Sequence, residues 1–138
     1  MTISADLLRG YTDTIIMRQL AETDGYGYGI SRTVAEKSDG MVQLKEATLY
    51  TAFRRMEENG YIRSYWGDEA TGARRRYYSL TEPGKAKLDE ERNAWALTRG
   101  VMDTLWLLFA IHALRVPERA GGPMKEAVLV DRRKSDGR

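Results

Sequence analysis

The chain has 138 residues, 42% of them hydrophobic and 30% charged, which suits one folded, soluble domain with an appended segment. It has no cysteine and a single histidine, His112. Disulfides, zinc knuckles, thiol catalysis and iron–sulfur clusters are therefore excluded, and any histidine-built metal site or relay would have to use that residue. Its 22 basic and 20 acidic residues give a formal charge of +2, too small to indicate nucleic-acid binding unless the bases are clustered.

The first part of the chain carries the pattern of two helices. Apolar residues at helical spacing predict a helix over residues 3–21, with Ser4 as its N-cap. A shorter helix is predicted from Gly27 to Ser38, where Ile30 and Val34 are four residues apart. The glycines before it lack both the GxGxxG spacing and the preceding strand of a phosphate-binding loop, so we expect a turn there.

A third helix is predicted from Lys45 to Asn59, with Gly60 following as the C-cap. Its apolar stripe consists of Leu49, Phe53 and Met56. The opposite face carries polar and basic side chains, namely Thr48, Thr51, Arg54 and Arg55.

The periodicity then changes from helix to strand. Residues 62–66 and 74–80 alternate in polarity, with turn residues 67–72 between them, which predicts a β-hairpin with a flexible polar tip. We expect the globular domain to cover Trp66. Thr81 is a suitable N-cap for a new helix that follows the hairpin.

That last helix is predicted to run from residue 82 to residue 114. Four residues recur in it every seven positions: Leu88, Trp95, Met102 and Phe109. A heptad seam needs a partner helix, and at 1.5 Å per residue this helix would be about 50 Å long, longer than the preceding domain is wide. We therefore expect a second copy of the chain to cover the seam, with Leu105 of a weaker second series contributing.

We expect a cytoplasmic protein without membrane contact. The first ten residues contain no apolar targeting run. The most apolar stretch, residues 101–114, is shorter than a bilayer-spanning helix and carries Asp103 and His112.

The order of the predicted elements is that of a winged helix-turn-helix, a fold that is mainly α with a small β-hairpin (α+β). The predicted divisions are a DNA-binding domain over residues 1–81, a C-terminal dimerisation helix over residues 82–115 and a flexible polar tail over residues 116–138.

Basic residues are concentrated where this fold would contact DNA. Arginines at 54 and 55 lie on the helix that would enter the major groove, and those at 63 and 74–76 lie on the hairpin, interleaved with tyrosines. Guanidinium and phenol groups are common donors to phosphate oxygens. The alternatives are a solvated surface and a dimerising adaptor whose winged helix binds protein rather than DNA.

Three segments resemble the signature of the PadR family: Gly27 to Ile30, Ala47 to Ile62, and Arg76 to Gly84. The order and spacing match from about residue 6 to residue 96. The runs Ser64 to Glu69 and Gly72 to Arg75 further resemble the LmrR-like, multidrug-sensing branch. The resemblance implies a homodimeric winged-helix repressor whose C-terminal helix pairs with that of its partner and packs on the partner's first helix.

The resemblance also implies roles for single residues. Tyr50 would face DNA, although its apolar neighbour Leu49 leaves a core position open. In LmrR-like members a tryptophan from each long helix sandwiches a flat aromatic drug, and Trp95 falls at that position; its place on the heptad seam equally fits the dimer core, and the two roles are compatible. Arg99 stands where that branch has an acidic residue for cationic drugs, which implies neutral or anionic guests.

We therefore expect a DNA-binding transcriptional repressor that is released from an inverted-repeat operator by a planar aromatic molecule. The expected DNA contacts are Lys45, Thr48, Tyr50, Thr51, Arg54, Arg55, Arg74, Arg75 and Arg76. The expected ligand site comprises Leu7, Tyr11, Thr14, Leu88, Glu91, Trp95 and Arg99. The expected dimer contacts are Leu88, Trp95, Met102, Leu105 and Phe109. No catalytic set, metal site or cofactor is expected, because no nucleophile–base pair can be assembled.

Overall fold

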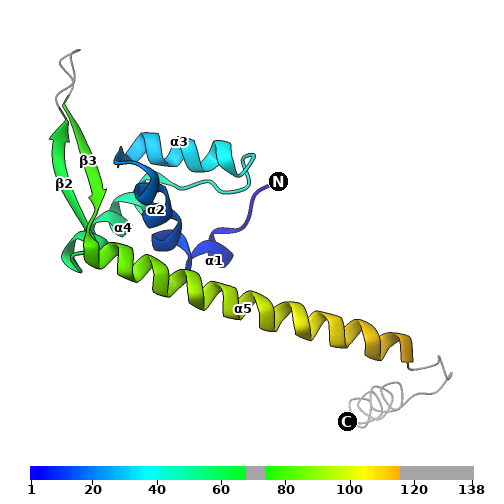
Figure 1. Cartoon of the computed structure of the whole chain (residues 1–138). Coiled ribbons are helices and arrows are strands. Elements are labelled where there is room, and N and C mark those ends of the chain that lie inside the picture. The colour runs from blue at the N-terminus through cyan, green and yellow to red at the C-terminus, as the bar shows by residue number, and fades with distance from the viewer. Residues whose placement is uncertain (68–73, 116–138) are drawn as a thin grey trace, which may run out of the picture. The chain divides into compact units, whose positions relative to one another are not determined.

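The computed structural model describes residues 1–67 and 74–115 and has the mostly helical α+β architecture predicted for a winged helix-turn-helix (Figure 1). Its elements are α1 (Ala5–Leu8), α2 (Thr12–Glu22), β1 (Gly25–Tyr26), α3 (Gly27–Lys37), α4 (Glu46–Glu58), β2 (Ile62–Gly67), β3 (Arg75–Leu80) and α5 (Glu82–Arg115). The predicted flexible tail and residues 68–72 of the predicted hairpin tip lie outside the described residues. The chain divides into two compact units, Met1–Ala96 and Leu97–Arg138, so the boundary falls inside α5.

The predicted single helix over residues 3–21 is wrong, because the chain breaks between α1 and α2. Ser4 caps α1 as predicted, its Oγ accepting a backbone N–H bond at 3.3 Å. Gly10 lies at the break, and glycine is a poor helix former. The hydroxyl of Thr12 donates to the carbonyl of Leu8 at 3.2 Å, a local bond that competes with a continuous helix.

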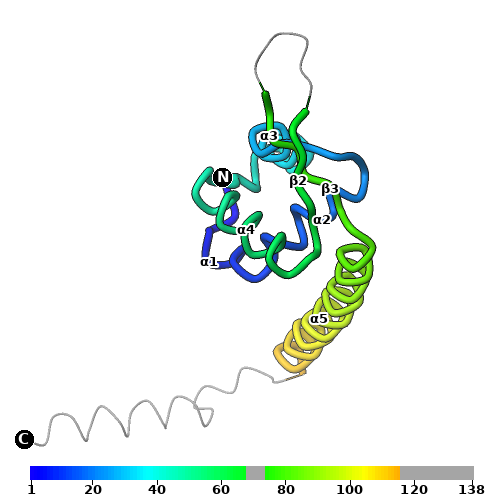
Figure 2. The backbone as a smooth tube through the Cα atoms, turned by 90° about the vertical axis from the view of Figure 1, so that its left-hand side faces the viewer, coloured from blue at the N-terminus to red at the C-terminus, as the bar shows by residue number. Residues whose placement is uncertain are grey.

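Helices α3 and α4 confirm the other two predicted helices, and Figure 2 shows both grouped with α2. Lys45 is the N-cap of α4. Gly60 follows its last turn with φ +76°, and its amide donates to the carbonyl of Glu57 at 3.0 Å while the amide of Tyr61 donates to that of Met56 at 2.9 Å. This pair of bonds is the Schellman arrangement, in which glycine is favoured at the left-handed position.

The predicted hairpin is the larger part of a three-stranded antiparallel sheet in the order β1–β3–β2. Strand β1 is two residues long, too short to produce an alternating pattern, and was not predicted. Trp66, opposite Arg76 near the tip, is 62% exposed, so its predicted burial is wrong. The core contacts are made by Ile62 and Tyr78, nearer the base of the hairpin.

The core joins the helices to the sheet. The rings of Phe53 on α4 and Tyr78 on β3 are stacked with their centres 4.0 Å apart, and both residues are buried. The predicted stripe of α4 is buried with them, and the full core consists of Ile16, Met17, Leu20, Ile30, Val34, Leu44, Leu49, Ala52, Phe53, Met56, Ile62 and Tyr78.

The first turn of α5 is seated on the loop after α4. As predicted, Thr81 caps this helix, with its Oγ1 accepting from the amide of Gly84 at 3.1 Å and donating to the carbonyl of Gly60 at 2.6 Å. Gly84 is buried so closely that a Cβ built on it would lie 2.0 Å from the carbonyl oxygen of Tyr61. The junction between α5 and the first domain therefore requires glycine at this position.

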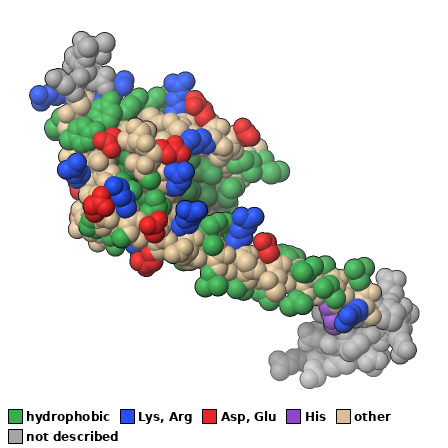
Figure 3. Space-filling model, in the orientation of Figure 1, with side chains coloured by type: hydrophobic (Ala, Val, Ile, Leu, Met, Phe, Trp, Pro, Cys, Tyr) green, Lys and Arg blue, Asp and Glu red, His purple; other side chains and the backbone are tan. Residues whose placement is uncertain are grey.

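The second unit continues α5 with exposed apolar side chains, many of which are visible in Figure 3. By length and composition alone, α5 could cross a membrane, since its best 18-residue window has a mean hydropathy of 1.2. Residues 101–114 were predicted to be too short to span a bilayer, but the whole of α5 is long enough. One such helix is a weak indication of a span, and this one also carries Arg99 and Asp103, 3.9 Å apart.

Two glycines of α5 provide a test of the junction. Gly84→Ala should lower the free energy of unfolding by about 1–3 kcal/mol, because the added methyl group overpacks the site. Gly100→Ala has no atom within 4 Å of the added Cβ and should stabilise the helix by about 1 kcal/mol. Urea denaturation at one protein concentration measures both. A Gly84→Ala protein as stable as the unaltered chain would contradict the tight junction.

Candidate nucleic-acid interface

Helix α4 offers one face to solvent and turns the other into the core. Lys45, Tyr50, Thr51 and Arg54 are exposed, whereas the apolar stripe is buried. The Thr51 hydroxyl donates to the carbonyl of Ala47 at 2.8 Å and is therefore engaged within its own helix. Tyr50 is 49% exposed, and a Cβ built on Gly27, at the start of α3, would lie 3.3 Å from its hydroxyl. The tyrosine thus lies against α3 at the edge of the exposed face.

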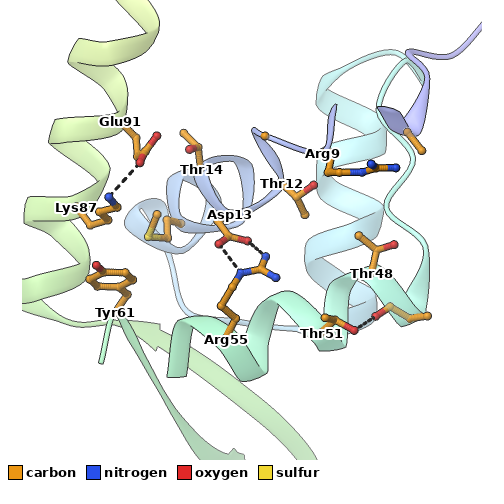
Figure 4. Close-up of a pocket in the computed structure, with 14 residues that line it drawn as sticks. Arg9, Thr12, Asp13, Thr14, Thr48, Thr51, Arg55, Tyr61, Lys87 and Glu91 are labelled. Carbon is orange, nitrogen blue, oxygen red and sulfur yellow. Dashed lines mark hydrogen bonds and ion pairs between the residues drawn. The ribbon is translucent and has the colours of Figure 1, made fainter. Parts of the chain in front are cut away.

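Arg55 lies beside this face and is held within the molecule. Its Nε donates to Oδ2 of Asp13 at 3.1 Å and its Nη2 to Oδ1 at 2.5 Å, a bidentate ion pair between α4 and α2 (Figure 4). Hydrogen bonding to Asp13 raises the pKa of the Arg55 guanidinium further above its usual value. Asp13 was not predicted as part of the site, because no local pattern relates positions 42 residues apart.

The hairpin arginines also differ from one another. Nη2 of Arg76 donates to Glu57 at 3.0 Å and to the Ser64 hydroxyl at 2.9 Å, so this arginine is tied to α4 and β2. The guanidinium of Arg75 lies 4.5 Å from the ring centre of Tyr26, a cation–π distance. Arg74 is exposed and, like Arg54, makes no ion pair with any residue that the structure describes.

A row of tyrosines crosses the sheet beneath Arg75. Tyr65 and Tyr77 are paired across β2 and β3 and stack with centres 5.7 Å apart, and Tyr26 on β1 contacts Tyr77 at 5.6 Å. The hydroxyl of Tyr65 donates to Asp24 at 2.6 Å, a bond that raises the pKa of the phenol. This packing joins β1 to both strands of the hairpin. Tyr26 and Asp24 were not predicted as part of the interface.

A cleft of about 620 Å³ opens where α1, α2, α4 and the first turns of α5 meet (Figure 4). Hydroxyl groups of Thr12, Thr14, Thr48, Thr51 and Tyr61 line it together with two ion pairs. One is Asp13–Arg55, and the other joins Lys87 and Glu91 at 3.2 Å, which raises the pKa of the lysine. Thr48 and Thr51, both predicted to contact DNA, therefore line this cleft from α4 and are exposed.

The structure brings together part of the predicted ligand set. The ring of Tyr11 meets Trp95 edge-on with centres 5.3 Å apart, and Trp95 remains 47% exposed. Thr14 and Glu91 both line the cleft. Leu7 is exposed at 70% and joins no core cluster.

The predicted seam is exposed except at its start. Trp95, Met102, Leu105 and Phe109 are all exposed. Leu88 instead packs against the core of its own domain, because the first turns of α5 lie on that core. A seven-residue repeat of apolar residues does not show whether each of them packs within its own chain or against a partner helix.

Comparisons with known proteins agree with this architecture. Residues 16–90 match the family described as the transcriptional regulator PadR-like family. A Lysinibacillus sphaericus protein described as uncharacterized is 41% identical over 101 residues, which cover 73% of this chain and 93% of that protein.

Solved structures of other proteins also agree with this architecture. A Clostridium thermocellum transcriptional regulator has a TM-score of 0.67 at 45% identity, covering 72% of this chain and 97% of that one. A PadR family transcription regulator from Clostridium difficile has a TM-score of 0.63 at 38% identity, and the match covers 70% of this chain and 99% of that one. Helix α4 and the hairpin β2–β3 have the places of the recognition helix and the wing in a winged helix-turn-helix. With this fold and the sequence match over residues 16–90, the chain belongs to the PadR-like family of transcriptional regulators, which are DNA-binding proteins and not enzymes.

Proposed function

We propose that this protein is a homodimeric, cytoplasmic repressor that binds an inverted-repeat operator and is released by a planar aromatic molecule held at the dimer interface. The observation that carries the proposal is the half-exposed Trp95, which lies on the apolar seam of α5 and contacts Tyr11 of the DNA-binding domain. One residue thus borders both the surface that would bind a partner and the domain that would bind DNA.

The proposed DNA contacts follow from exposure and charge. The outward face of α4 would enter the major groove, with Tyr50 and Thr51 near base edges and Lys45 and Arg54 near phosphates. Arg74 would contact the DNA backbone from the hairpin β2–β3. Arg55, Arg75 and Arg76 each bind a group of the protein itself, and we propose that their first role is to orient α4 and the wing.

The proposed dimer follows from the exposed apolar side chains of α5. Trp95, Met102 and Phe109 are seven residues apart and exposed in the single chain, as expected for positions that pair with another helix. A two-fold dimer would present two copies of α4 about one turn of DNA apart, which favours an inverted-repeat operator.

The proposed ligand site lies between Trp95 and its copy in the partner. Two indole rings facing one another suit a flat aromatic guest, and aromatic pairs add about 0.5–1.5 kcal/mol beyond the area they bury. Tyr11 would form part of the wall, since its ring already meets Trp95 at 5.3 Å. A ligand can release DNA only if it favours a different arrangement of the two DNA-binding domains.

Arg54→Ala should weaken binding to every duplex and reduce the slope of log K against log salt by about one phosphate contact per subunit. Arg18→Ala, which removes the same charge from an exposed position on α2, is the matched control and should change the slope much less. Tyr50→Phe should instead change the relative affinities of different duplexes. Mobility-shift titrations over a range of salt concentrations measure all three. If the unaltered protein shifts no duplex at any salt, the adaptor alternative replaces the repressor.

Met102→Glu or Phe109→Glu should convert the dimer to a monomer, because a charge in a helix seam costs several kcal/mol. Sedimentation equilibrium at low micromolar concentration should give about twice the chain mass of 15.7 kDa for the unaltered protein and the chain mass for the variants. Ala110→Glu is the control, since position 110 lies seven residues after Asp103 on another side of the helix. A monomeric unaltered protein would contradict the seam.

Trp95→Ala should abolish binding of a neutral planar aromatic dye while the protein still dimerises and still shifts DNA. Dye fluorescence titration measures the binding, and release of labelled duplex by the dye measures the coupling. Trp66→Phe, which alters an exposed indole on the wing, is the control and should bind the dye unchanged. Equal dye affinity in the Trp95→Ala protein would mean that Trp95 has only a packing role.

A further inference from the structure

We infer that Asp13 is a positioning residue for DNA recognition: by holding Arg55 it couples the Tyr11–Trp95 contact to the orientation of α4. The inference rests on the proposed function, because it concerns how a change at Trp95 would reach the DNA-binding face. Asp13 itself lies outside every predicted DNA or ligand contact.

The geometry of the pair suits a rigid link. Both oxygens of Asp13 accept from Arg55, at 2.5 and 3.1 Å, so the planar guanidinium and the carboxylate fix their relative orientation as well as their distance. Within residues 1–67 and 74–115, this pair supplies the side-chain hydrogen bonds between α2 and α4. Asp13 also lies in the first turn of α2, where the helix dipole favours a carboxylate.

The position of the pair connects the two proposed binding sites. Asp13 follows Tyr11 by two residues, and Tyr11, the N-cap of α2, contacts Trp95. Arg55 follows Arg54, on the exposed face of α4. A ligand that moves Trp95 would therefore move the start of α2, and the ion pair would carry that movement to the recognition helix.

The pair also lies in the cleft rather than in a packed interior. The Arg55 and Asp13 side chains are 50% and 34% exposed, and the cleft on which they lie is open to solvent. An ion pair this exposed contributes little to global stability. We therefore assign it the orientation of α4 and not the stability of the fold.

Two conservative variants test the assignment. Asp13→Asn removes the charge but keeps the shape, and Arg55→Lys keeps the charge but removes the fork. Glu22→Gln is the matched control, because it breaks a similarly exposed pair between α2 and Lys37 of α3 that does not involve α4. Circular dichroism should show that all three variants are folded at the assay temperature.

The first measurement does not use DNA. With Trp66→Phe and Trp106→Phe as background, Trp95 is the one remaining tryptophan, since the chain has three. Asp13→Asn and Arg55→Lys should each change the emission of Trp95 and its quenching by acrylamide, although neither residue is in ring contact with it, and Glu22→Gln should not. Unchanged Trp95 emission in both variants would overturn the inference even if the protein binds no DNA.

The second measurement uses a duplex selected by the unaltered protein from a random-sequence library and a shuffled duplex of equal composition. Both variants should lower the ratio of the two affinities by roughly fivefold or more, the low end of typical coupling between sites. The double variant should lose no more than either single variant. A changed Trp95 emission with an unchanged ratio would overturn the coupling, whereas failure of the unaltered protein to select any duplex would overturn the proposed function.

Discussion

The stack of Phe53 on Tyr78 is the contact on which the arrangement of this winged helix depends. It joins the recognition helix α4 to the central strand of the sheet, with ring centres 4.0 Å apart and both residues buried. Because Phe53 points inward, the side chains on the far side of α4 must point outward, which exposes Thr51 and Arg54. Because Tyr78 is the partner, β3 and therefore the wing are held beside the same helix.

Several arginines around this contact bind groups of the protein itself. Glu57 on α4 binds Arg76 on β3, and Asp13 on α2 binds Arg55 on α4, so two arginines are used to orient the surface on which they lie. Arg75 is placed over a tyrosine ring. The local excess of basic residues is therefore larger than the number of cations free to meet phosphate, which is why counting arginines overstates the electrostatic contribution to DNA binding.

Helix α5 has different surroundings along its length. Its first turns are part of the DNA-binding domain, with Gly84 packed on the carbonyl of Tyr61 and Leu88 on the core. From Leu97 onward its apolar side chains are exposed in the single chain. A helix with apolar residues on most of its circumference is stable when other helices or a similar apolar surface cover it, and the proposed pairing of two chains provides that cover along the seam.

The sequence by itself determined most of the secondary structure, because the relevant signals are local. Helical spacing identified α3, α4 and α5, alternation identified the hairpin, and the capping residues Ser4 and Thr81 act as predicted. The order of these elements predicted the winged helix-turn-helix, and the resemblance to the PadR family predicted the class of function. Tertiary structure decided the rest, since it depends on contacts between distant positions. The break at Gly10 and the short strand β1 leave no periodic pattern, and the exposure of Trp66 depends on how far the sheet extends past its helices. Likewise, which arginines remain available depends on carboxylates up to 42 residues away, such as Asp13, and no spacing rule within one helix or strand can reveal such a partner.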